Sequence, residues 1–274
     1  MKFSVSYVSE GDFTFPFVMR GSYVTAIKKA AQLGYKAVEI HVRDPQELDV
    51  EGIWRVCQGE GILISTLGTG LGYVIDGLSI TDPDSQIRAK ATRRLLEHIE
   101  VASYLKAGVI IGSIRGRVPK GEEFLKYEGY VLEAITACLE KAKECGVTLF
   151  LEAINRYETN LINTAAEGLK FISKFESELQ KYLKLHLDTF HMNIEEANLL
   201  QSIRQAGKLL GHIHFADSNR LRPGLGHIDF KAILSTLREV DYSGYIAFEY
   251  LPYPEPERAA EEGLCYVRGL LEEI

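Results

Sequence analysis

The sequence lacks the features that mark several large classes of protein. Its four cysteines form neither a CxxC pair nor a dense framework, which is typical of reduced thiols in a cytosolic protein. No segment approaches the ~20 apolar residues that a membrane-spanning helix needs. The first residues also lack the continuous apolar stretch of a secretory signal. We therefore expect a cytoplasmic protein with no membrane partner.

Positive charge is also scarce. The 31 Lys and Arg residues are outnumbered by 38 Asp and Glu residues, so the formal charge is −7. Nucleic acids and anionic membranes are held by basic patches, and neither is expected as a partner. What the chain does have is an ordinary globular composition, with 46% hydrophobic and 25% charged residues. This is enough apolar material to bury a large core.

Short apolar or β-branched runs alternate with longer stretches of helical periodicity, which is typical of a parallel sheet covered by helices. We expect eight strands, at Phe3–Val8, Ala37–His41, Leu63–Leu67, Gly108–Gly112, Thr148–Ile154, Leu183–Asp188, His212–Ala216 and Tyr245–Tyr250. We expect helices at Tyr23–Leu33, Asp84–Leu105, Glu122–Glu144, Thr164–Phe175, Leu199–Leu209, Phe230–Val240 and Glu257–Leu271. Eight such units without a linker predict one α/β domain over residues 1–274. A closed (β/α)8 TIM barrel is favoured over an open doubly wound sheet.

Polar residues end the last four expected strands. Glu152, Asp188, His214 and Glu249 each lie at or near the end of an otherwise apolar run. Any one of them alone would more often be a structural ion-pair partner or a core residue. In a barrel, however, these strands are neighbours, and converging carboxylates repel one another without a cation. The set predicts one divalent metal ion, Mn2+ first, with Mg2+ or Co2+ as alternatives and Zn2+ disfavoured.

Four stretches around these residues carry a family resemblance: EAINRYETN at 152–160, DTFHMNIEE at 188–196, HFADSNR at 214–220 and PGLGH at 223–227. They resemble the D-tagatose 3-epimerase and D-psicose 3-epimerase family of xylose-isomerase-like TIM barrels. In the first half of the chain, GTGLGY at 68–73 and DGLS at 76–79 look closer to a branch that includes 5-keto-L-gluconate epimerases.

The resemblance implies a metal bound by the same four residues, together with substrate contacts from Glu158, His191 and Arg220. It also implies a keto-sugar substrate and a homodimer or homotetramer. The expected reaction inverts the carbon next to the carbonyl through a cis-enediolate. Such a reaction needs a base on one face of the carbon, an acid on the other and a cation at the carbonyl oxygen. We expect Glu152 and Glu249 to be the two catalytic groups.

Two arginines and two further histidines complete the set of candidate residues. Arg115 and Arg117 follow the fourth expected strand, and arginine binds carboxylates and phosphates through paired contacts. An acidic keto-sugar is therefore a hypothesis, beside the alternative of ordinary solvated loop side chains. His186 and His212 precede Asp188 and His214 by two residues, so we expect them one layer deeper on the same strand face, in structural roles.

Three other functions stay open at this point. An aldose-ketose or hydroxypyruvate-type isomerase would use similar ligands and return the proton to a different carbon. An endonuclease IV-like hydrolase would need a multinuclear zinc cluster and a basic face, which seven histidines and a negative charge do not favour. A non-catalytic sugar-binding barrel would have no use for two opposed glutamates.

Overall fold

The computed structural model describes residues 1–9 and 14–274. Its strands are β1 (Lys2–Val8), β2 (Met19–Arg20), β3 (Ala37–His41), β4 (Leu63–Gly68), β5 (Gly108–Ile111), β6 (Leu149–Glu152), β7 (Leu183–Asp188), β8 (Leu210–Phe215) and β9 (Tyr245–Phe248). Its α-helices are α1 (Tyr23–Leu33), α2 (Val50–Glu60), α3 (Gly70–Val74), α4 (Ser85–Leu105), α5 (Phe124–Cys145), α6 (Ala165–Ile172), α7 (Ser177–Gln180), α8 (Thr189–Glu195), α9 (Leu199–Ala206), α10 (Phe230–Glu239) and α11 (Pro256–Glu272).

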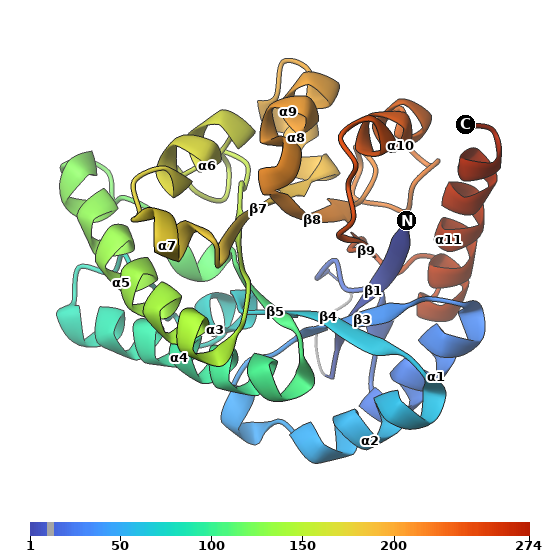
Figure 1. Ribbon diagram of the computed structural model, residues 1–274, viewed down its shortest axis with the longest axis horizontal. Helices are drawn as coiled ribbons and strands as arrows, with labels where there is room; N and C mark the ends of the chain where they lie inside the picture. The colour runs from blue at the N-terminus through green and yellow to red at the C-terminus, as the bar shows by residue number, and fades with distance from the viewer. Residues whose placement is uncertain (10–13) are drawn as a thin grey trace.

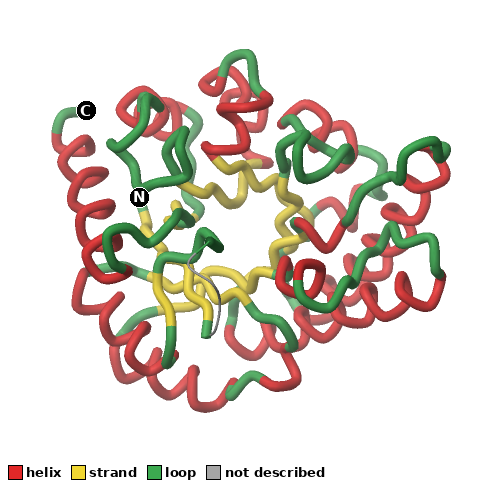
Figure 2. The backbone as a smooth tube through the Cα atoms, turned by 180° about the vertical axis from the view of Figure 1, so that it is seen from behind, coloured by secondary structure: helices red, strands yellow, loops and turns green. Residues whose placement is uncertain are grey.

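The strands form a closed parallel barrel. The pairing order runs β1, β3, β4, β5, β6, β7, β8, β9, and β9 pairs back onto β1. The short strand β2 adds to β1 outside this order. Figure 1 and Figure 2 show the strands as an inner ring with the helices around it. The predicted single-domain (β/α)8 TIM barrel is therefore confirmed, and each predicted strand end lies within two residues of the observed one.

The helices include four that the periodicity did not predict: α2, α3, α7 and α8. Two glycines, Gly52 and Gly59, interrupt the apolar pattern of α2, while the other three helices are too short to show a period. The long helix α4 begins where Asp84 accepts a hydrogen bond from the backbone N–H of Gln86, an ordinary N-cap. No helix in the described ranges is both long and apolar enough to cross a bilayer.

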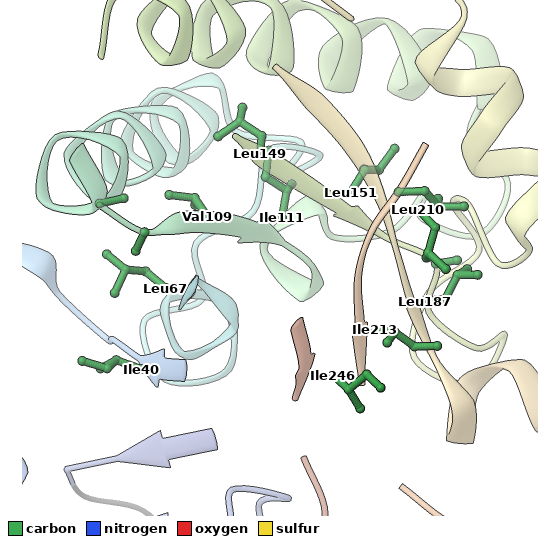
Figure 3. Close-up of a cluster of buried hydrophobic side chains, with 14 of the residues drawn as sticks. Ile40, Leu67, Val109, Ile111, Leu149, Leu151, Leu187, Leu210, Ile213 and Ile246 are labelled. Atoms are coloured by element: carbon green, nitrogen blue, oxygen red, sulfur yellow. The ribbon is translucent and has the colours of Figure 1, made fainter. Parts of the chain in front are cut away.

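Alternation along the strands separates an apolar layer from a polar one, because successive side chains point to opposite faces. Figure 3 shows the apolar layer, a buried cluster of leucine, isoleucine and valine side chains that includes Ile40, Leu151, Leu187, Ile213 and Ile246. The neighbouring positions carry polar side chains that are equally buried: Glu39, His41, Glu152, Asp188, His212 and His214. The apolar face packs under the helices, and the polar face fills the barrel.

The connection after β5 is held by a buried arginine. The side chain of Arg115 is 1% exposed, and it donates to the carbonyl oxygen of Glu152 at 2.8 Å and to that of Leu161 at 2.9 Å. Burial lowers the pKa of Arg115 to about 10, so the guanidinium remains charged at neutral pH. Arg115 thus ties the loop after β5 to the end of β6, where Glu152 lies.

Replacing Arg115 with Gln should therefore destabilise the barrel. Loss of charge-assisted hydrogen bonds to buried carbonyl groups is expected to lower the free energy of unfolding by about 1.5–3 kcal/mol. Urea unfolding followed by circular dichroism measures this change. Arg117→Gln is the matched control, because Arg117 is exposed and its replacement should change stability by less than ~0.5 kcal/mol. Equal stability of the two variants would contradict the bracing role.

Candidate metal centre

The barrel brings the four predicted metal ligands to one end. Glu152 and Asp188 are the last residues of β6 and β7, His214 is the penultimate residue of β8, and Glu249 directly follows β9. Their exposed fractions are 8%, 0%, 1% and 7%. Neighbouring strands therefore place three carboxylates and an imidazole in one buried region.

The distances divide the candidate ligand side chains of this region into two groups that share one residue. Nδ1 of His214 lies 3.3 Å from Oε2 of Glu249 and 3.7 Å from Oδ2 of Asp188. Asp188 also lies with Glu152 and His191 in a group whose ligand atoms are all within 4.8 Å of one another. Asp188 is thus common to both groups. Its other oxygen, Oδ1, accepts from the N–H of Phe190 at 2.7 Å and caps α8.

Arg220 is the main counter-charge to these carboxylates. Its guanidinium lies 2.5 Å from Oδ2 of Asp188 and also contacts Oε2 of Glu249. Burial acts to raise the pKa values of Asp188 and Glu249, but Arg220 and the nearby histidines hold both below their ordinary range. Glu152 lacks such close support. Burial, with the negative charges of Glu249 and Asp188, raises the pKa of Glu152 to about 8.

The donor set fits a divalent cation. Both ring nitrogens of His214 are buried and make no hydrogen bond of good geometry within the described residues, and Nδ1 faces two carboxylate oxygens. Carboxylate oxygens with one imidazole suit Mn2+ and similar ions. A cation would also remove the cost of crowding charged carboxylates in a buried site.

A cavity of about 320 Å3 opens over this cluster. Glu152 and Glu249 line it, and so do all three residues that the resemblance linked to substrate, namely Glu158, His191 and Arg220. Most of its other lining residues are apolar and include Phe15, Pro16, Phe17, Leu71, Val74, Ile154 and Phe190. The cavity therefore combines a polar floor with apolar walls, as sugar-sized ligands require.

Asn155 sets the orientation of two of these residues, and no sequence pattern predicted this role. The amide of Asn155 donates to Oε1 of Glu158 at 2.8 Å and lies 2.7 Å from Nδ1 of His191. Because an amide nitrogen only donates, Nδ1 of His191 is the acceptor. Burial lowers the pKa of His191, so the ring is neutral and carries its hydrogen on Nε2. That N–H lies on the side of Glu152, 3.8 Å from Oε1.

The two predicted arginines lie elsewhere. Arg115 is not among the described residues that line the 320 Å3 cavity, although it borders an adjoining space of about 230 Å3 that shares Gly112, Ser113 and Glu158 with it. Arg117 is exposed and lines neither space within the described ranges. The structure therefore does not bring these two side chains together with the metal cluster.

Three more residues of the site were missed. Glu39 and His41 lie on β3 and point to the barrel interior beneath the carboxylates. A charged residue within the run AVEIH was the available signal, since Glu is almost never fully buried without a partner. Gly112 lies beside Glu152, and a Cβ atom there would lie 2.4 Å from Oε2 of Glu152. Only glycine leaves room for that carboxylate.

His186 and His212 lie below the metal cluster, where alternation placed them. His212 is 1% exposed, and its Nε2 lies 2.7 Å from Oε2 of Glu39. His186 is fully buried, with its ring centroid 4.1 Å from that of His214. Both rings fill the barrel interior.

Comparison with known proteins gives a consistent family. A family model described as a xylose isomerase-like TIM barrel matches residues 27–270. The L-ribulose 3-epimerase of Methylomonas sp. is 33% identical over 248 residues, which cover 89% of this chain and 84% of that protein. The D-psicose 3-epimerase of Ruminiclostridium cellulolyticum is 34% identical over 238 residues, 83% of this chain and 78% of that protein.

A crystal structure of D-allulose 3-epimerase from Methylomonas sp. superposes with a TM-score of 0.83 at 25% identity, and the match covers 98% of both chains. The buried carboxylate and histidine cluster described above is of the kind that such a family uses to hold a metal ion. These matches show that the chain belongs to the xylose isomerase-like TIM barrels and is a sugar epimerase of the ketose 3-epimerase family.

Proposed function

We propose that the protein is a divalent-metal-dependent ketose 3-epimerase, which inverts the carbon next to the carbonyl of a keto-sugar. The observation that carries the proposal is the position of two glutamates. Glu152 and Glu249 line the same cavity from β6 and β9, which are separated in the barrel by β7 and β8. Carboxylates that reach one ligand from two sides can act on opposite faces of one carbon.

The relatives support a keto-sugar as substrate, because the names of several refer to ketoses. Glu158, His191 and Arg220 are the proposed hydroxyl-binding residues, and all three line the cavity. The neutral ring of His191 would donate through Nε2, and Glu158, held by Asn155, would accept. The adjoining space of about 230 Å3, which Arg115 borders, could hold the end of the sugar chain that is remote from the carbonyl.

Glu152, Asp188, His214 and Glu249 are the proposed ligands of one metal ion, and Mn2+ best suits their oxygen-rich set. When bound, the ion would supply Lewis acidity that stabilises negative charge on the carbonyl oxygen. Asp188 has one oxygen committed to the cap of α8, so it would bind through Oδ2. His214 would bind through Nδ1, which faces the carboxylates.

The proton transfer follows from the two glutamates. One carboxylate removes the proton from the carbon next to the carbonyl, and the electron pair of the broken C–H bond forms the enediolate. The other glutamate, protonated, returns a proton to the opposite face of the same carbon, and the carbonyl reforms in its original place. Each turnover moves one proton from the substrate to one glutamate and one from the other glutamate to the product. Exchange with water then restores both groups.

Glu152→Gln and Glu249→Gln should each lower kcat by ~100- to 10,000-fold, the usual contribution of a general acid or base. Both variants should keep the wild-type circular dichroism spectrum, because the amide has the shape of the carboxyl group. Glu178→Gln is the control, since Glu178 is exposed and pairs only locally with Lys181. Wild-type turnover by Glu249→Gln would rule out the assignment.

Removal of the metal and the choice of substrate can be tested together. Neutral, uronate and phosphorylated keto-sugars are incubated in D2O with Mn2+, and the products are identified by NMR. We expect one epimer with the carbonyl unmoved, deuterium at the inverted carbon, and loss of activity with EDTA that Mn2+ restores. A shifted carbonyl would instead identify an aldose-ketose isomerase.

A further inference from the structure

A single buried carboxylate lies beneath the candidate metal centre. Glu39 is fully buried on β3. Its Oε2 accepts from Oγ1 of Thr66 at 2.5 Å and lies 2.7 Å from Nε2 of His212. Its Oε1 lies 2.9 Å from Nε2 of His41 and 2.9 Å from Nε2 of His214. One carboxylate thus connects three imidazoles and a hydroxyl group from three strands.

This arrangement is unusual for a barrel interior. An ionised carboxylate is costly to bury unless it is paired and hydrogen-bonded, and an apolar residue could fill the same volume. Three imidazoles and a hydroxyl group surround this carboxylate, and their positions show what it does.

The first contact orients His214. Because Nε2 of His214 faces Glu39, the other ring nitrogen, Nδ1, is turned toward Asp188 and Glu249. Metal-binding histidines commonly direct their second ring nitrogen to a carboxylate, which fixes the tautomer and the ring orientation. Glu39 is such a carboxylate for His214, although β9 and β1 lie between β8 and β3 in the barrel.

The second contact orients Glu249. Nε2 of His41 lies 2.9 Å from Oε1 of Glu39 and 3.5 Å from Oε1 of Glu249. The ring of His41 is confined on two sides. Its centroid lies 4.1 Å from that of Phe17, and a Cβ atom at Gly68 would lie 2.3 Å from its Nδ1.

The two oxygens of Glu249 therefore have different neighbours. Oε2 faces Nδ1 of His214, on the side of Asp188, whereas Oε1 faces His41. Each imidazole places its Nε2 2.9 Å from Oε1 of Glu39. The oxygen of Glu249 that faces the candidate metal ligands is therefore distinct from the oxygen beside His41.

We infer that Glu39 is a positioning residue, which fixes the metal-binding nitrogen of His214 and, through His41, the proton-transferring oxygen of Glu249. The second half of this inference rests on the proposed epimerase function, whereas the first half requires only metal binding. Glu39 itself does not line the 320 Å3 cavity among the described residues, so it does not touch substrate.

Glu39→Gln tests the inference, because it removes the charge and keeps the shape. Loss of a carboxylate partner of a metal-binding histidine typically weakens metal affinity ~10- to 100-fold, and we expect a change of this size in the Kd for Mn2+. The Kd is measured from the EPR signal of free Mn2+ in a titration of the full-length protein. The kcat should fall at saturating Mn2+, with KM little changed.

Two control variants separate the contacts of Glu39. Thr66→Val removes one hydrogen bond to Glu39 and leaves its charge and its histidines in place, so the Mn2+ affinity should stay within ~3-fold, less than the loss of a metal-orienting partner. His41→Gln removes the imidazole between Glu39 and Glu249 and leaves Nε2 of His214 beside Glu39, so kcat should fall while the Mn2+ affinity is retained. Wild-type Mn2+ affinity in a folded Glu39→Gln protein would overturn the inference.

A measurement on the wild-type protein keeps the inference testable if Glu39→Gln does not fold. In protein labelled with 15N histidine and loaded with diamagnetic Mg2+, His214 should carry its hydrogen on Nε2. A hydrogen on Nδ1 would refute the role of Glu39. If the wild type binds Mn2+ but epimerises no keto-sugar, the proposed function fails, while the Mn2+ affinities of wild type and Glu39→Gln still decide the metal-orienting role.

Discussion

The site depends on the balance of charge among buried carboxylates. Glu39, Glu152, Asp188 and Glu249 are each at most 8% exposed, and each is close to at least one other acidic or basic group of the cluster. Buried anions repel one another and lose hydration, so each must find a cation or donor. The histidines of β3 and β8, together with Arg220, partly meet this need. The carboxylate of Glu152 has the weakest compensation, which is the physical reason for proposing a metal ion here.

The barrel makes this concentration of charge tolerable by separating it from the core. The apolar cluster of Figure 3 packs between strands and helices, while the polar side chains point into the barrel. The apolar layer can therefore supply stability while the interior holds the polar cluster. Sites rich in buried charge usually cost stability, and this architecture assigns the stabilising and functional roles to alternate positions of the same strands.

Much of the fold and part of the site could be predicted from the sequence, for identifiable reasons. Strand positions and the residues at strand ends can be read from short stretches of sequence, because alternation and an apolar run that ends in a polar residue each span only a few positions. The contacts of Glu39 and Asn155 are not local. Glu39 meets His212 across 173 positions of sequence, and Asn155 meets His191 across 36. The direction in which the Arg115 side chain points could not be predicted either, because an arginine that lines a cavity and an arginine that is buried beside the cavity follow the same sequence pattern.

The two halves of the chain also contribute differently to the cavity. The proposed ligands and hydroxyl-binding residues all come from the second half, where the family motifs are dense, while Phe15, Phe17, Leu71 and Val74 from the first half form apolar walls. Changes in these walls can alter which sugar fits without disturbing the metal chemistry. Glu39 and His41 of β3 are exceptions, because they come from the first half and yet reach His214 and Glu249. Substrate choice can therefore vary along the first half, whereas the role proposed for Glu39 requires that β3 keep this carboxylate.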